Sequence, residues 1–358
     1  MRDMTRPSLR VIDTGLRTGR ENIAFDQAMI DAHQAGEISD SLHFYQFKPV
    51  ALVGRHQATR QEVRVDFCKA NGVEVGRRIT GGGAIFLDEN QLGWAIICKR
   101  SSLGGGALGD VTKKICEAAA AGLSKLGVEA RYRPRNDIEV AGRKISGTGG
   151  FFDGDTLIYQ GTVIGDLNPD IMFGVLNVPR EKLEKRSLDA ASLRVTSLKE
   201  ELGTAPDWER VKDALAEAFG ENLGLQLQWG KASETEEARA RASYEEEIGT
   251  DEFVYEIDDP ARDAGVRTGV ATGAGGTVKA HVRMEGPNDH RIREVLITGD
   301  FFVTPPRLVL DLEAALRGAE PSAISERVDA FFRDADVGLL SIAPADFAAA
   351  VSDAVGAK

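Results

Sequence analysis

The amino-acid sequence predicts an α+β protein, with mixed sheets and packed helices in a larger N-terminal domain and a small α+β domain at the C-terminal end. Its 358 residues are more than a single hydrophobic core usually serves, so we expect two domains. The charged stretch at residues 233–249 has no clear apolar face, and we interpret it as a solvated helix or linker. After it, two strand-like segments precede two helical ones, which favours helices packed on one face of a sheet. We therefore divide the chain into residues 1–232, the linker 233–249 and residues 250–358.

The helices are predicted from apolar residues that recur at helical spacing. In residues 21–36 the apolar positions follow this spacing, and Gly36 is suited to end the helix. Residues 110–128 have Asp110 in position to cap a helix whose apolar face includes Val111 and Leu126. Further helices are expected at residues 207–223, 306–318 and 324–335.

The strands are predicted from short apolar segments bounded by turn residues. Pro49 breaks residues 41–57 into two short strands, and the stretch Asp88–Gln91 forms a turn between two neighbouring strands. In residues 137–165 we expect three strands, joined by turns at Gly142 and at residues 153–155. In the C-terminal domain, strands are expected at residues 277–284 and 293–303.

The composition narrows the class of protein. The net charge of −12 argues against a nucleic-acid binder, which normally carries a basic balance, although a local basic pocket for a small anion stays possible. The three cysteines form no Cys-x-x-Cys pair and show no zinc-ligand spacing, which fits a reduced protein. The N-terminal residues do not resemble a signal peptide, and no segment approaches the roughly 20 apolar residues of a membrane span. We therefore expect a cytoplasmic protein that binds neither nucleic acid nor a membrane.

Two arginines, Arg77 and Arg78, precede three consecutive glycines, Gly81, Gly82 and Gly83, at the start of a predicted strand. Glycines leave the backbone N–H groups accessible, and such groups favour anionic oxygens. If the segment before them is a strand, the arginines point to opposite faces, so one can face a ligand while the other supports the sheet. The P-loop pattern is absent, and the dinucleotide fingerprint would need a helix where a strand follows. The glycines therefore form either an anion-binding loop or a tight turn.

A second motif, "NDIEVAGRKISG", sets Asn136 and Asp137 at the start of one strand and Lys144 on the next. A turn at Gly142 would fold these strands together and bring an amide, a carboxylate and an amine into one region. Two unit charges ~4 Å apart interact by about 4 kcal/mol at an effective dielectric near 20, so the lysine could neutralise a phosphate. Asp137 could hold Mg²⁺ through its carboxylate oxygens.

Together, "RRITGGGAIFLD" and "NDIEVAGRKISGTGG" resemble the lipoate–protein ligase A family. The similarity extends to "NIAFDQAM", to "LHFYQFKPVALVGRHQ" and to the C-terminal "KAHVRMEG" and "IREVLITGDFF", and so covers most of the chain. It implies a biotin/lipoate ligase-like catalytic domain at residues 1–232 and an accessory domain at 250–358. It also implies a two-step reaction. Lipoic acid and ATP, with Mg²⁺, give lipoyl-AMP, and the acyl group then passes to a lysine of an apo lipoyl domain or lipoate-carrier protein.

The resemblance implies a role for each motif residue. Lys144 matches the family lysine that contacts the carboxyl and phosphate oxygens, and it is not the covalent acceptor. Asn136 and Asp137 match the nucleotide and metal end of the site. Gln57 falls where the family segment borders the acyl pocket, with the neighbouring His56 as a surface residue, and Ile85 and Trp94 are candidates for the apolar tunnel. The remaining expected contacts to the acyl-adenylate are Arg77, Arg78, Gly81, Gly82, Gly83 and Gly147.

One position departs from the family pattern. The family usually reads His-Asp where this chain has Leu87 and Asp88, so an imidazole contact is missing. This puts in doubt any role of position 87 in contacts to ATP or the acyl group.

Three alternative activities stay open. An octanoyl or lipoyl transferase of the same fold would need an activated thiol, yet Cys98 and Cys116 lie in apolar patterns and Cys68 is distant from both motifs. Biotin ligation is a second alternative, and a non-catalytic lipoyl-adenylate-binding protein is a third. The acceptor protein, the choice between lipoate and octanoate and the oligomeric state do not follow from the sequence.

Overall fold

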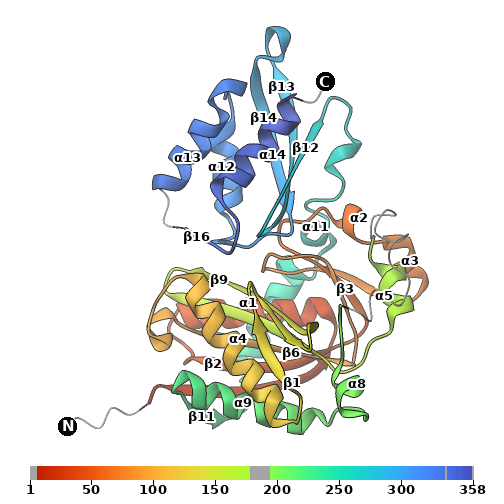
Figure 1. Ribbon diagram of the computed structural model, residues 1–358, viewed down its shortest axis with the longest axis vertical. Helices are drawn as coiled ribbons and strands as arrows, with labels where there is room; N and C mark the ends of the chain where they lie inside the picture. Colours follow the sequence, from red (N-terminus) through yellow and green to blue (C-terminus); the bar gives the residue numbers. More distant parts are fainter. Residues whose placement is uncertain (1–5, 178–193, 335–336, 357–358) are drawn as a thin grey trace, which may run out of the picture.

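The computed structural model describes residues 6–177, 194–334 and 337–356. An N-terminal body contains an eight-stranded sheet, and a smaller C-terminal body with its own sheet lies above it in Figure 1. Within the described ranges, no helix combines the length and the apolar character needed to cross a membrane.

The large sheet mixes parallel and antiparallel pairs. Its three strands at one edge, β11, β1 and β2, pair in parallel, and the other strands pair antiparallel. The central strand β6 is buried from its first residue to Cys98, because both faces of the sheet are covered there. In spatial order the strands are β11 (Gln226–Trp229), β1 (Ser8–Arg17), β2 (Ser41–Phe47), β6 (Gln91–Lys99), β10 (Thr156–Ile164), β9 (Arg143–Asp153), β8 (Asp137–Val140) and β7 (Ala130–Arg133).

Helices cover both faces of this sheet. The helices α4 (Leu108–Lys125) and α9 (Trp208–Leu223) pack against each other and form one hydrophobic core with the sheet (Figure 1). The helix α1 (Gly19–Gln34) contributes to a second core with the opposite side chains of β2, β6 and β10. Thr18 and Glu21 form a capping box that starts α1. The predicted helices at residues 21–36 and 110–128 correspond to α1 and α4.

A second, three-stranded sheet packs beside α1. It has the order β4 (Glu74–Arg77), β3 (Val50–Val53) and β5 (Ile85–Leu87), with β3 parallel to β4 and antiparallel to β5. Short helices complete the N-terminal body: α2 (Thr59–Glu62), α3 (Val65–Ala70), α5 (Pro169–Val175), α8 (Leu198–Leu202), α10 (Glu234–Ser243) and α11 (Asp251–Val254).

The C-terminal body has strands on one side and helices on the other, as its strand-then-helix order predicts (Figure 1). Its antiparallel sheet consists of β12 (Arg267–Gly273), β13 (Gly276–Glu285) and β14 (Arg291–Gly299). The helices are α12 (Leu308–Leu316), α13 (Ile324–Asp334) and α14 (Pro344–Gly356), and β15 (Val303–Thr304) pairs with β16 (Gly338–Leu339). The predicted α+β class is confirmed.

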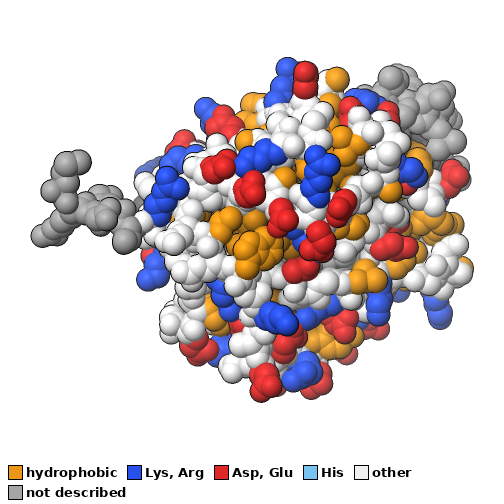
Figure 2. Space-filling view, turned by 90° about the horizontal axis from the view of Figure 1, so that it is seen from below, with side chains coloured by type: hydrophobic (Ala, Val, Ile, Leu, Met, Phe, Trp, Pro, Cys, Tyr) orange, Lys and Arg blue, Asp and Glu red, His pale blue; other side chains and the backbone are white. Residues whose placement is uncertain are grey.

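The surface carries charges of both signs. On the face of the N-terminal body seen in Figure 2, basic side chains are interspersed with acidic ones rather than gathered in one patch. Elsewhere in the described chain, oppositely charged side chains form ion pairs across elements, such as Arg17 with Glu237 at 2.6 Å and Arg143 with Glu201 at 2.7 Å.

The segment expected to be a solvated helix or linker does contain a helix, α10, but it packs on the N-terminal body. The helix α10 lies against α1, with Ala240 buried and with Glu236 paired to Arg10 on β1. Ile248 and Phe253 join the core beneath α1. The composition is misleading here because the acidic residues contact basic partners from distant strands. We keep the division into two domains as a proposal and place its boundary after Asp259 rather than at residues 233–249, because Asp258 and Asp259 still contact Arg60 and Gln61.

Arg77 fixes this segment to the rest of the body. Its side chain is only 1% exposed, and its guanidinium donates hydrogen bonds to the carbonyls of Val254 at 2.9 Å, Gln57 at 2.8 Å and Phe253 at 3.1 Å. Burial, with the charge of Arg55, lowers its pKa to about 9. Arg77, predicted to contact a ligand, therefore has a supporting position in the structure, because backbone carbonyls occupy its donors on the face opposite to Arg78.

We predict that Arg77→Met lowers the free energy of unfolding by about 3 kcal/mol or more, since several buried carbonyls, among them those of Gln57 and Phe253, would lose a charged donor. Chemical denaturation monitored by fluorescence measures this loss. Arg60 offers a matched control, because its pair with Asp258 at 3.0 Å is solvent-exposed and Arg60→Met should cost less than about 1 kcal/mol. An unchanged unfolding midpoint for Arg77→Met would contradict the structural role.

Candidate active site

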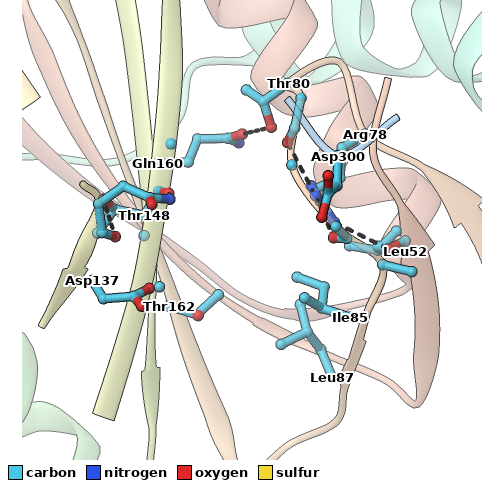
Figure 3. Close-up of a pocket in the computed structure, with 18 of the residues that line it drawn as sticks. Leu52, Arg78, Thr80, Ile85, Leu87, Asp137, Thr148, Gln160, Thr162 and Asp300 are labelled. Carbon is cyan, nitrogen blue, oxygen red and sulfur yellow. Dashed lines mark hydrogen bonds between the residues drawn. The ribbon is translucent and has the colours of Figure 1, made fainter. Parts of the chain in front are cut away.

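A cavity of about 460 Å³ opens between the two sheets of the N-terminal body. In Figure 3, Asp137, Thr148, Gln160 and Thr162 form one wall, and Leu52, Arg78, Ile85 and Leu87 form the other. Residues of the C-terminal body, including Asp300 and Phe302, contribute to the lining. The cavity therefore lies where both bodies and both N-terminal sheets meet.

A buried polar network joins the two walls. Asp26 on α1 is fully buried and accepts hydrogen bonds from His43 Nδ1 at 3.2 Å, from the Tyr45 hydroxyl at 3.2 Å and from Gln160 Nε2. Thr80 then donates to Gln160 Oε1 at 3.2 Å, the contact drawn at the top of Figure 3. Burial and the Asp26 charge raise the pKa of Tyr45 well above its usual value, so its hydroxyl stays a donor. The network fixes the glycine loop relative to β10.

Arg78 supports the glycine loop through hydrogen bonds to backbone carbonyls. Its guanidinium donates to the carbonyls of Gly81 at 3.1 Å, Gly83 at 2.9 Å and Leu52 at 3.0 Å. Burial lowers its pKa to about 10, so it remains charged at neutral pH. Gly82 has φ of +96°, a conformation that favours glycine. Of the two arginines, Arg78 therefore lines the cavity.

The three glycines differ in what their N–H groups contact. Gly82 donates to the carbonyl of Phe301 at 3.2 Å, so the C-terminal body occupies that donor. Among the residues that the structure describes, the N–H groups of Gly81 and Gly83 have no hydrogen-bond acceptor. These two groups are candidate donors to an anion, and the positive charge of Arg78 lies beside them, although its Nη atoms donate to loop carbonyls.

Lys144 lies on the opposite wall. The hairpin of β8 and β9 turns at Ala141 and Gly142, with φ of +49° and +82°, as predicted. The Lys144 amine then lies 2.8 Å from the Asp137 carboxylate. The Lys144 side chain crosses Gly147, where a Cβ would approach Nζ to 2.7 Å, so a larger residue there would displace the amine from its present position. The glycine loop and Lys144 thus line one cavity.

Two cations hold Asp137 in its ionised form. Burial alone would raise its pKa, but Lys144 and Arg133, whose guanidinium lies at 2.6 Å, keep the pKa below its usual value. Asn136 faces the same end of the cavity, and its side-chain amide donates to the carbonyl of Thr148 on β9.

Among the described residues at the Asn136 and Asp137 end of the cavity, Asp137 is the one carboxylate that could bind Mg²⁺. No group of three or more His, Cys, Asp or Glu side chains within the described ranges could hold a metal ion. Mg²⁺ commonly binds one or two carboxylates and completes its shell with substrate phosphates and water. Asp137 therefore fits an ion that arrives with a phosphate ligand.

Most of the predicted site residues line the cavity, but Gln57 does not. Its side-chain oxygen accepts the Gly54 N–H at 2.9 Å, and its own carbonyl accepts from Arg77, so both groups serve the loop after β3. Gln57 therefore supports this loop, and the structure gives no contact between its side chain and the cavity. The predicted residues that do line the cavity are Arg78, Gly81, Gly82, Gly83, Ile85, Asn136, Asp137, Lys144 and Gly147.

Two further residues differ from expectation. Trp94 packs on Tyr159 and Phe219 on the other face of the sheet, outside the cavity. His56 is 6% exposed rather than on the surface, and its ring stacks on Phe301 at 5.1 Å between centroids. Burial, with the charges of Arg55 and Arg77, lowers the pKa of His56 to about 3.

Four further residues line the cavity that were not predicted from the sequence: Tyr45, Thr80, Gln160 and Phe302. A glutamine within the apolar strand "TLIYQGTVI" was a usable signal, because a polar side chain in a buried strand needs partners. Leu87 is 4% exposed and adds an apolar surface at the position where the family usually has histidine. Asp88 forms a turn, accepting the Asn90 N–H at 2.8 Å.

None of the three cysteines, all in the described part of the chain, lines the cavity. Cys116 lies behind Thr148, with its sulfur 3.3 Å from the Thr148 hydroxyl. Burial raises the pKa of all three thiols, that of Cys68 to about 11. The arrangement therefore offers donors for a carboxylate or phosphate and no thiolate nucleophile.

Comparison with known proteins gives a family match and several relatives. The family model described as the lipoyl protein ligase A/B catalytic domain matches residues 18–220, more than half of the chain. An octanoyltransferase LipM from Symbiobacterium thermophilum is 30% identical over 267 residues, which cover 68% of this chain and 97% of the relative. Subunit 1 of a lipoate-protein ligase A from Thermoplasma acidophilum is 27% identical over 247 residues, covering 65% and 91%.

The fold extends this similarity to the C-terminal body. The crystal structure of LipL1 from P. falciparum in complex with lipoate superposes with a TM-score of 0.71 at 16% identity, covering 92% of this chain and 95% of that chain. The chain thus has the biotin/lipoate ligase-like fold that the resemblance implied.

Proposed function

Because this chain belongs to the lipoyl protein ligase A/B family, we propose that it is an ATP-dependent lipoate–protein ligase, which activates lipoate to lipoyl-AMP and transfers the lipoyl group to a lysine of an apo carrier protein. Its family groups lipoate ligases with octanoyltransferases, enzymes that transfer acyl groups to proteins. The ATP-dependent step is the specific part of the proposal.

One observation carries this choice. The cavity presents cationic and N–H donors on facing walls, namely Arg78 with the glycine loop and Lys144 on β9, and none of the chain's cysteines reaches it. A site that offers hydrogen-bond donors to an oxyanion but no nucleophilic side chain suits a reaction in which one substrate attacks another. Here the two substrates would be a carboxylate and a phosphate ester. A transferase that forms a thioester would instead need an activated thiol in the cavity.

In the activation step, an oxygen of the lipoate carboxylate attacks the α-phosphorus of ATP, and pyrophosphate leaves with the electron pair of the broken P–O bond. Negative charge grows on the α-phosphate oxygens. Lys144 would contact these oxygens from one wall, and the N–H groups of Gly81 and Gly83 from the other. Donors that are already in place lower the barrier because they need no reorganisation as the charge develops.

The Asp137 end of the cavity would receive the nucleotide phosphates. In the structure, Asp137 holds Lys144 at 2.8 Å and Arg133 at 2.6 Å. Binding of a phosphate would draw Lys144 away from this carboxylate. A Mg²⁺ ion bound with ATP would neutralise phosphate charge, and Asp137 is the cavity carboxylate suited to bind it.

The acyl tail would lie against apolar side chains between β3, β5 and α5, where the cavity is lined by Leu52, Ile85, Leu87, Met172 and Leu176. Leu87 makes this part more apolar than the histidine usual in the family. In the transfer step the amine of the carrier lysine attacks the acyl carbon and AMP leaves. The proposed carriers are an apo lipoyl domain or a lipoate-carrier protein.

The second candidate is an octanoyl or lipoyl transferase that uses no ATP. It is favoured by the 30% identity with an octanoyltransferase LipM. A third outcome, a protein that binds lipoyl-adenylate without turnover, would give binding but no pyrophosphate. The two predictions below separate these functions.

We predict that Lys144→Ala folds normally, because the side chain is polar and 35% exposed, yet loses adenylate formation by ~10²–10³ in rate. The assay is pyrophosphate release with ATP, Mg²⁺ and lipoate. Lys114→Ala is a matched control, since Lys114 lies on α4 and donates to the carbonyl of Leu103 at 3.0 Å, outside the cavity. Turnover of Lys144→Ala at the wild-type rate would remove the proposed role.

We predict that the variant with Cys68, Cys98 and Cys116 all changed to Ser modifies an apo lipoyl domain at a rate close to that of the wild type. The physical reason is that none of these thiols reaches the cavity. Mass spectrometry of the carrier measures the modification, and thermal unfolding checks that the variant is folded. A folded variant that no longer transfers the acyl group would favour the thioester transferase.

A further inference from the structure

We propose that Phe302, supplied by the C-terminal body, shields the acyl-adenylate from water while it awaits the carrier lysine. This inference rests on the proposed ligase function and concerns the same cavity. Phe302 lies outside residues 18–220, which the catalytic-domain family model matches.

The segment that carries Phe302 is attached to the N-terminal body on both sides of the ring. Before it, the Gly299 N–H donates to the carbonyl of His56 at 2.9 Å. After it, the Thr304 hydroxyl lies 2.6 Å from both the N–H and the carbonyl of Phe152 on β9. Between these points, the Phe301 carbonyl accepts the Gly82 N–H. The position of Phe302 is therefore determined by contacts across the two bodies.

Neighbouring phenylalanines in this segment face opposite bodies. Phe301 belongs to the core of the C-terminal body, where its ring packs on Phe347 at 5.2 Å. Phe302 packs against the core of the N-terminal body and lines the cavity. Figure 3 shows Asp300, from the same segment, on the side of the cavity that Arg78 and Thr80 occupy. The ring of Phe302 is thus not needed to fill the core of its own body.

The ring spans the two walls at glycine positions. A Cβ at Gly82 would lie 2.7 Å from Cζ of Phe302, and a Cβ at Gly149 would lie 2.2 Å from Cε1. A side chain at position 82 or at position 149 would therefore collide with the ring in its present place. Gly149 is two residues along β9 from Gly147, where the Lys144 amine lies, and such residues share a face about 7 Å apart. The ring therefore lies beside the space between Lys144 and the glycine loop, where the anhydride would form.

The chemistry of the intermediate makes this position useful. The mixed anhydride of lipoate and AMP reacts with water: a water oxygen bonds to the acyl carbon, the bond to the phosphate oxygen breaks, and lipoate, AMP and a proton are released. That reaction consumes ATP without modifying a carrier. An apolar ring that excludes water from the anhydride suppresses it, as closed active sites do for other reactive intermediates.

The experiment measures AMP formation by the full-length protein with ATP, Mg²⁺ and lipoate in the absence of carrier. The wild type is expected to release one equivalent of pyrophosphate quickly and then to form AMP slowly. Phe302→Ala should keep the first phase and form AMP about tenfold faster in the second, which corresponds to a barrier lower by about 1.4 kcal/mol. With apo lipoyl domain added, this variant should consume more ATP per modified carrier.

Two further variants keep the result interpretable. Phe302→Leu retains an apolar shield and should restore slow AMP formation. Phe331→Ala removes a comparable half-buried ring from the C-terminal body, outside the cavity, and should behave as the wild type. A purely structural role of Phe302 would change the unfolding temperature but not the ratio of ATP consumed to carrier modified.

The possible results distinguish a failure of the proposed ligase function from a failure of the proposed shielding role. A wild type that releases no pyrophosphate would refute the ligase function itself. A wild type with the fast phase, combined with Phe302→Ala that forms AMP equally slowly or that folds but loses the fast phase, would overturn the shielding role alone.

Discussion

The geometry of the cavity depends on the buried carboxylate of Asp26. It accepts hydrogen bonds from His43, Tyr45 and Gln160, and so joins α1 to the third and fifth strands in the spatial order of the large sheet, β2 and β10. Through Gln160 the network reaches Thr80, at the start of the glycine loop. A fully buried carboxylate is costly unless its oxygens accept hydrogen bonds, so Asp26 and its three partners are held together. The distance between the glycine loop and β9 follows from this arrangement.

Local chemistry explains which parts of the site the sequence could predict. The β8–β9 hairpin was predictable because Gly142 supplies a turn with positive φ, and the hairpin alone brings Lys144 to Asp137. The glycine loop was recognisable from three successive glycines. The choice between Arg77 and Arg78 was not predictable, because alternation along a strand gives opposite faces but not which face meets the cavity. The structure places Arg78 there and buries Arg77 among carbonyls.

Long-range packing explains what the sequence could not provide. The acidic segment at 233–249 looked like a linker because its partners, such as Arg10 and Arg17, lie more than 200 residues earlier. Likewise, nothing near Phe302 in the chain indicates that its ring meets Gly82 and Gly149. The three glycines of the loop have two structural roles, which the local sequence alone could not distinguish. They leave N–H groups accessible to an anion, and they also allow the C-terminal body to approach.

The central claim is that the glycine loop and Lys144 bind one oxyanion between them. The most direct measurement is a crystal structure of the protein with a non-hydrolysable lipoyl-adenylate analogue, in which a sulfamoyl group replaces the phosphate. The account predicts that sulfamoyl oxygens lie within about 3.2 Å of both the Lys144 amine and the N–H groups of Gly81 or Gly83. An analogue bound elsewhere, or one whose sulfamoyl group contacts neither wall of the cavity, would contradict it.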